Sequence, residues 1–144
     1  MDHVIQLVFY SDLGSDFNNV AFLVFRILFA IELFRVHGLK KFRLENGQRE
    51  HVPNPLHLPE KLNGLVAGLS DTVVPFLIIL GVATRLAVIP TIGVTSIGYF
   101  IVHRKDNLEV RDVPYIYTIC LLLLLFLGAG RFSIDGIIFY KLFN

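Results

Sequence analysis

Apolar residues gather into four long runs separated by polar segments, and these runs are Val20–Val36, Gly64–Ala83, Leu86–Val102 and Val113–Ala129. A helix needs about 20 mostly apolar residues to cross a hydrocarbon core of ~30 Å. Isolated strands would leave backbone groups without partners in lipid, so each run is expected to form a helix. We therefore predict an all-α chain that folds as a transmembrane antiparallel four-helix bundle, with helices at approximately residues 18–37, 64–83, 86–103 and 113–130.

The segments between the runs differ in length and set the order of the bundle. Little more than Thr84 and Arg85 joins the second run to the third, which forces an antiparallel hairpin. The first connection, about Gly38–Asn63, is longer and contains three prolines. The apolar stretch Ile137–Phe143 predicts an interfacial C-terminal segment. We expect a single membrane domain over residues 1–144.

The composition is typical of a membrane protein and argues against nucleic-acid binding and against dithiol redox chemistry within the chain. Hydrophobic residues make up 54% of the chain and the mean hydropathy is +0.64. A net charge of +1 provides no basic surface for nucleic acid, so no such partner is expected. The single cysteine, Cys120, cannot form a dithiol pair within the chain, which excludes that redox chemistry.

Basic residues predict how the bundle is oriented. The positive-inside rule places Lys- and Arg-rich loops in the cytoplasm. The connections after the first and third runs carry Lys40, Lys41, Arg43, Arg49, Lys61, Arg104, Lys105 and Arg111. The other side carries only Arg85, Arg131 and Lys141. The two longer connections are therefore expected to be cytoplasmic.

Five ionisable residues lie in or beside the apolar runs, namely Arg26, Glu32, Asp71, Arg85 and His103. A charge at the middle of a bilayer costs roughly 2.5–3.5 kcal/mol on insertion scales, so these positions predict a polar interior that binds a ligand. The alternative is a set of structural ion pairs, for instance Asp71 with Arg35 or with Lys41. Glu32 and Arg35 are three residues apart and can pair on one helix face.

Antiparallel helices sort the polar residues into two ends of the bundle. One end collects Glu32, Arg35, His37, Lys41, Asp71, His103, Asp112, Tyr115 and Tyr117. The other end collects Arg26, Arg85, Arg131, Ser133 and Asp135. Arg26 and His37 are expected on nearly the same face, and the nearby Phe22, Phe25 and Phe29 are interpreted as packing residues. Gly64 and Gly68 form a small-residue pair that favours close helix contact.

The sequence contains few signals for a metal or a cofactor. His37 and His103 end parallel helices at similar depth and could ligate a haem, but histidine is common at membrane interfaces and haem is not favoured. No zinc-ligand spacing is present, so no metal is expected. No GxSxG elbow, GxGxxG loop or Walker loop is present either.

The order of these residues resembles the DoxX family of small four-helix membrane proteins. The family's Arg and Gly-x-x-Lys match Arg26 and the stretch Gly38–Lys41, and its acidic residue ten positions before G-x-x-T-R matches Asp71 and Gly81–Arg85. A final histidine on the third helix matches His103, and an acidic residue and Tyr on the fourth match Asp112 and Tyr115. The closing G-x-G-R-x-S-x-D pattern matches Gly128, Gly130, Arg131, Ser133 and Asp135. The family more often has Glu where this chain has Asp71.

The resemblance implies a multi-pass protein of the bacterial cytoplasmic (inner) membrane, in contact with lipid. The family takes its name from a subunit associated with a quinol oxidase, and other members are linked to oxidative-stress defence or act as membrane partners of enzymes. Our first hypothesis is a redox-associated subunit that holds a quinone-like or other amphipathic ligand. In it, Arg26 and Arg85 supply hydrogen bonds, while Glu32, Asp71, His37 and His103 handle protons. The alternatives are a non-enzymatic scaffold or assembly partner of a larger membrane complex, or a small pore that requires a homo-oligomer.

Overall fold

The computed structural model describes residues 2–42 and 52–143, and these residues form helices with no strand among them. The elements are α1 (Asp2–Phe9), α2 (Asp16–Leu33), the π-helical turn η1 (Phe34–Gly38), α3 (Leu39–Phe42), α4 (Glu60–Leu80), α5 (Thr84–Ile97), the π-helical turn η2 (Gly98–Val102), α6 (Leu108–Leu127) and α7 (Ile134–Phe143). Arg43 and Arg49, which entered the charge count of the first connection, lie outside the described residues.

Three helical stretches are long and apolar enough to cross a membrane in the part of the chain that the structure describes. They are α4, the continuous stretch Thr84–Val102 that α5 and η2 form together, and α6. The helix α2 has 18 residues but carries Asp16, Arg26 and Glu32. These charged residues distinguish α2 from the three apolar stretches. What α2 does in the fold therefore depends on the contacts that its charged side chains make.

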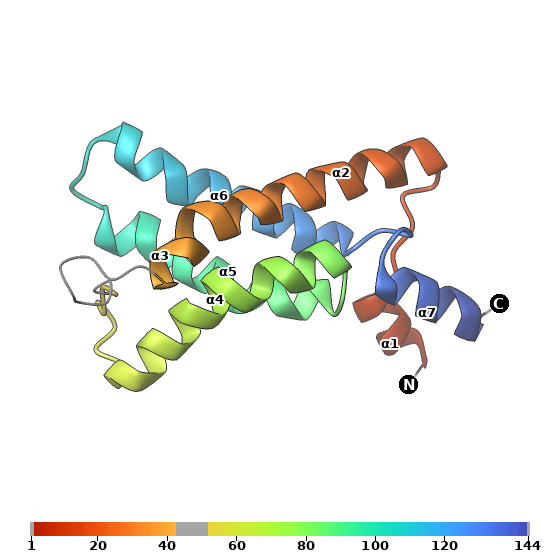
Figure 1. Ribbon diagram of the computed structural model, residues 1–144, viewed down its shortest axis with the longest axis horizontal. Coiled ribbons are helices and arrows are strands. Elements are labelled where there is room, and N and C mark those ends of the chain that lie inside the picture. The colour runs from red at the N-terminus through yellow and green to blue at the C-terminus, as the bar shows by residue number, and fades with distance from the viewer. Residues whose placement is uncertain (1, 43–51, 144) are drawn as a thin grey trace.

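The long helices lie alongside one another, and the two terminal helices sit together at one end (Figure 1). α5 packs against both α4 and α6, and α2 packs against α4. α1 and α7 are joined by stacked rings, because the centroids of Phe9 and Phe139 are 5.3 Å apart. The short helix α3 and the turn between η2 and α6 lie at the opposite end (Figure 1).

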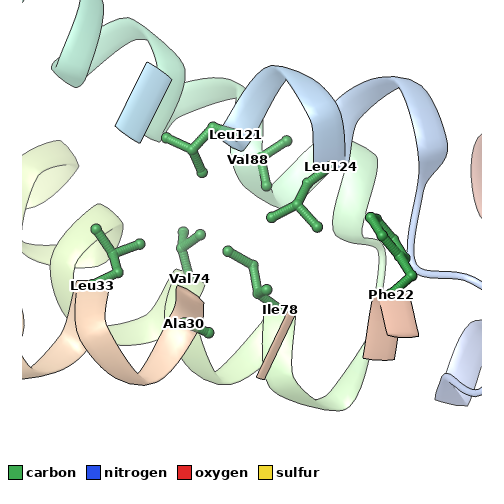
Figure 2. Packing of buried hydrophobic residues seen from close by; sticks show 8 residues of the cluster. All are labelled: Phe22, Ala30, Leu33, Val74, Ile78, Val88, Leu121 and Leu124. Carbon is green, nitrogen blue, oxygen red and sulfur yellow. The ribbon is translucent and has the colours of Figure 1, made fainter. Parts of the chain in front are cut away.

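Buried apolar side chains from the four long helices form one core cluster (Figure 2). Ala30 and Leu33 of α2 meet Val74 and Ile78 of α4, and α5 contributes Val88. Leu121 and Leu124 of α6 and Phe22 of α2 complete the cluster. The predicted packing role of the phenylalanines is confirmed, since Phe22 is buried and its ring centroid lies 5.8 Å from that of Phe25.

The π-helical turn η1 shifts the inward face of the first long helix by one residue. Buried positions on this helix follow the helical period at Phe22, Arg26, Ala30 and Leu33, and the next buried position is Gly38. A step of five residues matches the wider turn of a π-helix, a feature often found at functional sites. His37, four residues after Leu33, is partly buried and its ring contacts that of Tyr117, so the expected placement of His37 near the face of Arg26 stays a prediction.

The small-residue pair in α4 does not make the close helix contact that the sequence predicts. A Cβ atom added at Gly64 or at Gly68 would meet no heavy atom within 4 Å. The close approach occurs instead at Gly38, where an added Cβ would collide with the backbone oxygen of Asp71 and the ring of Phe34. Glycine spacing alone does not show which face of a helix meets a neighbour.

Candidate functional site

Arg26 of α2 contacts the backbone near the end of α4 and in the segment between α6 and α7. Its side chain is 1% exposed and its guanidinium donates hydrogen bonds to the carbonyl oxygens of Ala129 and Phe132, after α6. A longer bond of 3.4 Å reaches the carbonyl oxygen of Ile79 near the end of α4. Last-turn carbonyls of a helix have no partner within it, so an arginine can satisfy several at once. Arg26 thus holds the ends of α4 and α6 against α2.

Arg85, at the start of α5, also binds backbone carbonyls of other segments. Its Nη1 donates to the carbonyl oxygens of Val8 and Tyr10, each at 3.2 Å, and its Nη2 donates to that of Phe126 at 3.3 Å. It therefore joins α1 and the end of α6 to the start of α5. Both arginines that were expected to bind a ligand have guanidinium groups bonded to the protein's own backbone.

Asp135 completes what we call the arginine cluster, which consists of Arg26, Arg85 and Asp135. Its carboxylate accepts a 2.6 Å hydrogen bond from the amide of Ala83, while its own amide donates to the carbonyl oxygen of Gly81 at 3.1 Å. These bonds hold Ala83 in a left-handed conformation, with φ of 45°, which costs energy in a residue other than glycine. Burial raises the pKa of the Asp135 carboxyl, and the nearby charges of Arg26 and Arg85 oppose that rise.

Two glycines of the family pattern provide the space that the arginines occupy. An added Cβ at Gly81 would lie 2.9 Å from Nη1 of Arg26, and one at Gly128 would lie 2.7 Å from the guanidinium carbon of Arg85. Both glycines also have positive φ, at 68° and 75°. Glycine is required here for both reasons. Glycine therefore occurs at these two positions of the sequence motif because each lies against the guanidinium group of an arginine in the cluster.

A second polar network, which the sequence did not predict, ties the N-terminal segment to the end of α6. The side chain of Asn19 is 1% exposed; it accepts from the amide of Arg131 at 3.0 Å and donates to Asp12 at 2.8 Å. This hydrogen bond lowers the pKa of the Asp12 carboxyl. Ser11 accepts from the amide of Gly130, and Arg131 pairs with Asp16 at 3.0 Å. In the sequence, helical spacing places Asn19 on the same face as Phe22 and Arg26, and this could have predicted that Asn19 is buried.

At the opposite end of the long helices lies a cavity of about 530 Å³, within the range of roughly 300–1,000 Å³ typical of ligand pockets. α2, η1 and α3 provide one wall, the segment after residue 51 and α4 a second, and α5, η2 and α6 a third. Its polar lining residues are His37, Lys40, Lys41, Asn63, Asp71, Thr95, His103 and Tyr117. Four of the predicted site residues therefore share one cavity, namely His37, Lys41, Asp71 and His103.

An ion pair lies in the wall of the cavity. Nζ of Lys41 is 3.3 Å from the Asp71 carboxylate, and the two side chains are only 19% and 14% exposed. Gly38 makes this possible, because its missing side chain lets η1 approach the backbone of Asp71. Pro75, four residues after Asp71, has no amide hydrogen to donate to the Asp71 carbonyl oxygen. Of the two partners considered for Asp71, the structure has Lys41, while Arg35 pairs with Glu32 at 3.2 Å.

Aromatic and imidazole rings form the inner corner of the cavity. The His37 ring meets the Tyr117 ring edge-on, with centroids 5.1 Å apart, and Phe29 lies 5.7 Å from Tyr117. Tyr117 shares its helix face with Leu121 and Leu124, both fully buried, and this spacing was the signal for its inward position. His103 lies nearer the surface, where its Nδ1 is 2.7 Å from Asp106.

The remaining predicted site residues lie elsewhere. Glu32 pairs with Arg35 on a partly exposed face, and Asp112 is exposed. Tyr115 is 47% exposed and packs against Tyr99 with centroids 5.2 Å apart. Among the described residues, no group of three or more His, Cys, Asp or Glu side chains is placed to hold a metal ion.

Comparisons with known proteins agree with this arrangement of motifs. An uncharacterized protein of Haemophilus influenzae is 33% identical over 129 residues, which cover 84% of this chain and 85% of that protein. No solved structure matches the chain. The DoxX profile matches residues 21–104, a stretch that includes Arg26, the glycine of η1, the Lys41–Asp71 pair, Arg85 and His103. The chain belongs to the DoxX family of membrane proteins.

Proposed function

We propose that α2 crosses the bilayer together with the three apolar stretches, giving a transmembrane four-helix domain over residues 1–144. The outward face of α2 is apolar, with Val20, Val24, Leu28 and Ile31 between 47% and 61% exposed. Its charges are placed as a spanning helix requires, because Arg26 is buried, Asp16 begins the helix and Glu32 pairs with Arg35. α7 would lie in the interface beside α1. The basic connections favour an inner-membrane protein whose cavity end faces the cytoplasm.

We propose that this domain is a redox-associated subunit that binds a quinone-like amphipathic ligand in the cavity. The observation that carries the proposal is a cavity of about 530 Å³ with an apolar lining and a Lys41–Asp71 ion pair in its wall. Ligand sites are mainly apolar and use a few polar groups to orient the ligand. An ion pair that is mostly buried is costly unless it is held in place, which favours a functional role.

The geometry suggests a role for each group that lines the cavity. A flat ring would pack against Tyr117 and His37 at the inner corner, where edge and face contacts between rings are favourable. Ring oxygens would accept hydrogen bonds from Lys41 and from the Tyr117 hydroxyl. Asp71, His37 and His103 would handle protons at the polar end. Arg26 and Arg85 would only hold the helices, since their guanidinium groups bind backbone carbonyls.

Binding can be measured through the protein's own fluorescence. The chain has no tryptophan and five tyrosines, so tyrosine dominates its emission. We expect ubiquinone, added to the protein in phospholipid vesicles, to quench this emission with a saturable dependence on concentration. Quenching that rises linearly without saturation, together with no quinone in the purified protein, would contradict the proposal.

Two neighbouring tyrosines separate binding in the cavity from binding on the surface. Tyr117→Phe removes the hydroxyl of a residue that lines the cavity and is expected to weaken quinone binding by about tenfold, the effect of one lost hydrogen bond to a ligand. Tyr115→Phe, two residues away on the exposed face, is the matched control and should bind as the unmodified protein does. Equal affinities for the two variants would place the ligand elsewhere.

A second candidate function is that of a scaffold within a larger membrane complex. It is favoured by the small buried share of two spans, since only 11% of the apolar window is buried in Thr84–Val102 and in α6. If this reading holds, native mass spectrometry of gently extracted membranes should show the chain in a complex of constant composition. Recovery of a monomer alone, across several mild detergents, would count against it.

A further inference from the structure

The α5 wall of the cavity contains residues that also belong to the outer face of the helix. Leu86 and Ile89 are 50% and 52% exposed, and Phe100 is 65% exposed, which marks the outward stripe of this stretch. Gly93 lies on the same stripe by helical spacing, is exposed, and also lines the cavity. Pro90 is likewise exposed and lines the cavity. Because Gly93 shares the stripe of Leu86, Ile89 and Phe100, its place in the cavity lining indicates that the cavity extends to the outward face of α5.

This opening lies at the level of the bilayer's centre. Gly93 is the middle residue of the apolar stretch Thr84–Val102. On α4 the cavity is lined by Val66 and Ala67, in the first half of that helix. The opening is thus placed among lipid chains rather than among headgroups.

The gap follows from how the α4–α5 hairpin is built. The two helices are held together at their turn, where the arginine cluster binds, and Val88 and Thr91 are buried beyond it. Towards the other end, the start of α4 and the end of α5 point apart (Figure 1). Gly93 leaves this space open, because an added Cβ there would meet no heavy atom within 4 Å.

We infer that the cavity opens sideways into the bilayer between α4 and α5, and that its ligand is a lipid-soluble molecule that enters from the hydrocarbon core. The cavity-lining residues beside the inferred opening are apolar, namely Val66, Ala67, Pro90, Gly93 and Ile97. Of the polar groups, His37 and Lys41 belong to the wall formed by η1 and α3, and Asp71 of α4 is paired with Lys41. A bound molecule would hold its polar head near Lys41 and Asp71 and leave its apolar tail in the opening. This inference rests on the proposed binding of an amphipathic ligand.

The test blocks the opening without disturbing the protein around it. Gly93→Leu places a side chain in the opening, whereas Gly68→Leu is a matched control in α4, since its added Cβ also meets nothing and Gly68 does not line the cavity. Two probes are added to each protein in phosphatidylcholine vesicles: ubiquinone with its isoprenoid chain, and the ubiquinone ring without a chain. Saturable quenching of tyrosine emission reports binding of each probe.

We expect Gly93→Leu to weaken binding of the long-chain quinone by about tenfold or more, because the leucine side chain fills the space that the bound tail would occupy. The same variant should bind the chain-free ring normally, since the ring can enter at the polar end. Gly68→Leu should bind both probes normally. Long-chain binding that is unchanged in Gly93→Leu, or equal loss of both probes, would overturn the side opening. Absence of binding by the unmodified protein would instead overturn the proposed function.

Discussion

Arg26→Ala is expected to lower the free energy of unfolding by about 3–5 kcal/mol, the largest effect of any single substitution that we predict. The side chain is 1% exposed and donates to carbonyl oxygens of Ala129, Phe132 and Ile79. Without it, these carbonyl oxygens, of which that of Ala129 is buried, lose a donor, and Asp135 loses one of its two neighbouring cations. In a chain of this size we expect the midpoint of thermal unfolding to fall by about 10 °C.

The measurement is thermal unfolding of the purified protein in a mild detergent, followed by circular dichroism. Arg26→Lys should be intermediate, because an ammonium is compact and cannot reproduce the planar spread of a guanidinium. Arg104→Ala, in the exposed turn before α6, is the matched control and should unfold with the unmodified protein. An Arg26→Ala protein that is as stable as this control would show that the arginine cluster does not hold the helices.

Gly38→Ala is expected to destabilise the fold by about 1–3 kcal/mol, the usual range for overpacking, and to abolish ligand binding in the cavity. An added Cβ would collide with both the Asp71 backbone oxygen and the Phe34 ring. The helix would have to move away from α4, which would separate Lys41 from Asp71 across their 3.3 Å contact.

The second π-helical turn offers a matched control. At Gly98 an added Cβ would lie 3.5 Å from Pro114, an ordinary contact, so Gly98→Ala should fold as stably as the unmodified protein. Unfolding midpoints and quinone titrations of both variants are compared in the same vesicles. If Gly38→Ala keeps its stability and its affinity, the close approach at Gly38 is not what forms the site.

The sequence predicted many of the residues of the candidate site, but not which of them contact one another. The sequence predicted that Arg26, Arg85 and Asp135 share one end, and the hydrogen bonds around the α4–α5 turn confirm this. It also left Asp71 with two possible partners. The choice of Lys41 depends on η1, because the π-helical turn leaves Arg35 beside Glu32 and brings Gly38 against α4.

Tyr115, Tyr117 and Asn19 show why the positions of other residues could be known only from the tertiary structure. Tyr115 and Tyr117 are alike in the sequence, yet Tyr117 lines the cavity and Tyr115 packs against Tyr99 on the surface. The helical spacing from Leu121 and Leu124, which places Tyr117 but not Tyr115 on their buried face, could have distinguished the two tyrosines. Asn19 belongs to no motif that we recognised, although it has one of the least exposed side chains among the described residues.

By itself, the sequence determined that this is a helical membrane protein of the DoxX family, with a tight hairpin between its second and third apolar runs. These properties depend on local composition, run length and motif order, which are visible without contacts. Only the tertiary structure decided which charges bind the protein's own backbone and which line a cavity. That division depends on helix phase and on close approach at glycine, and a single π-helical turn or one missing Cβ changes both.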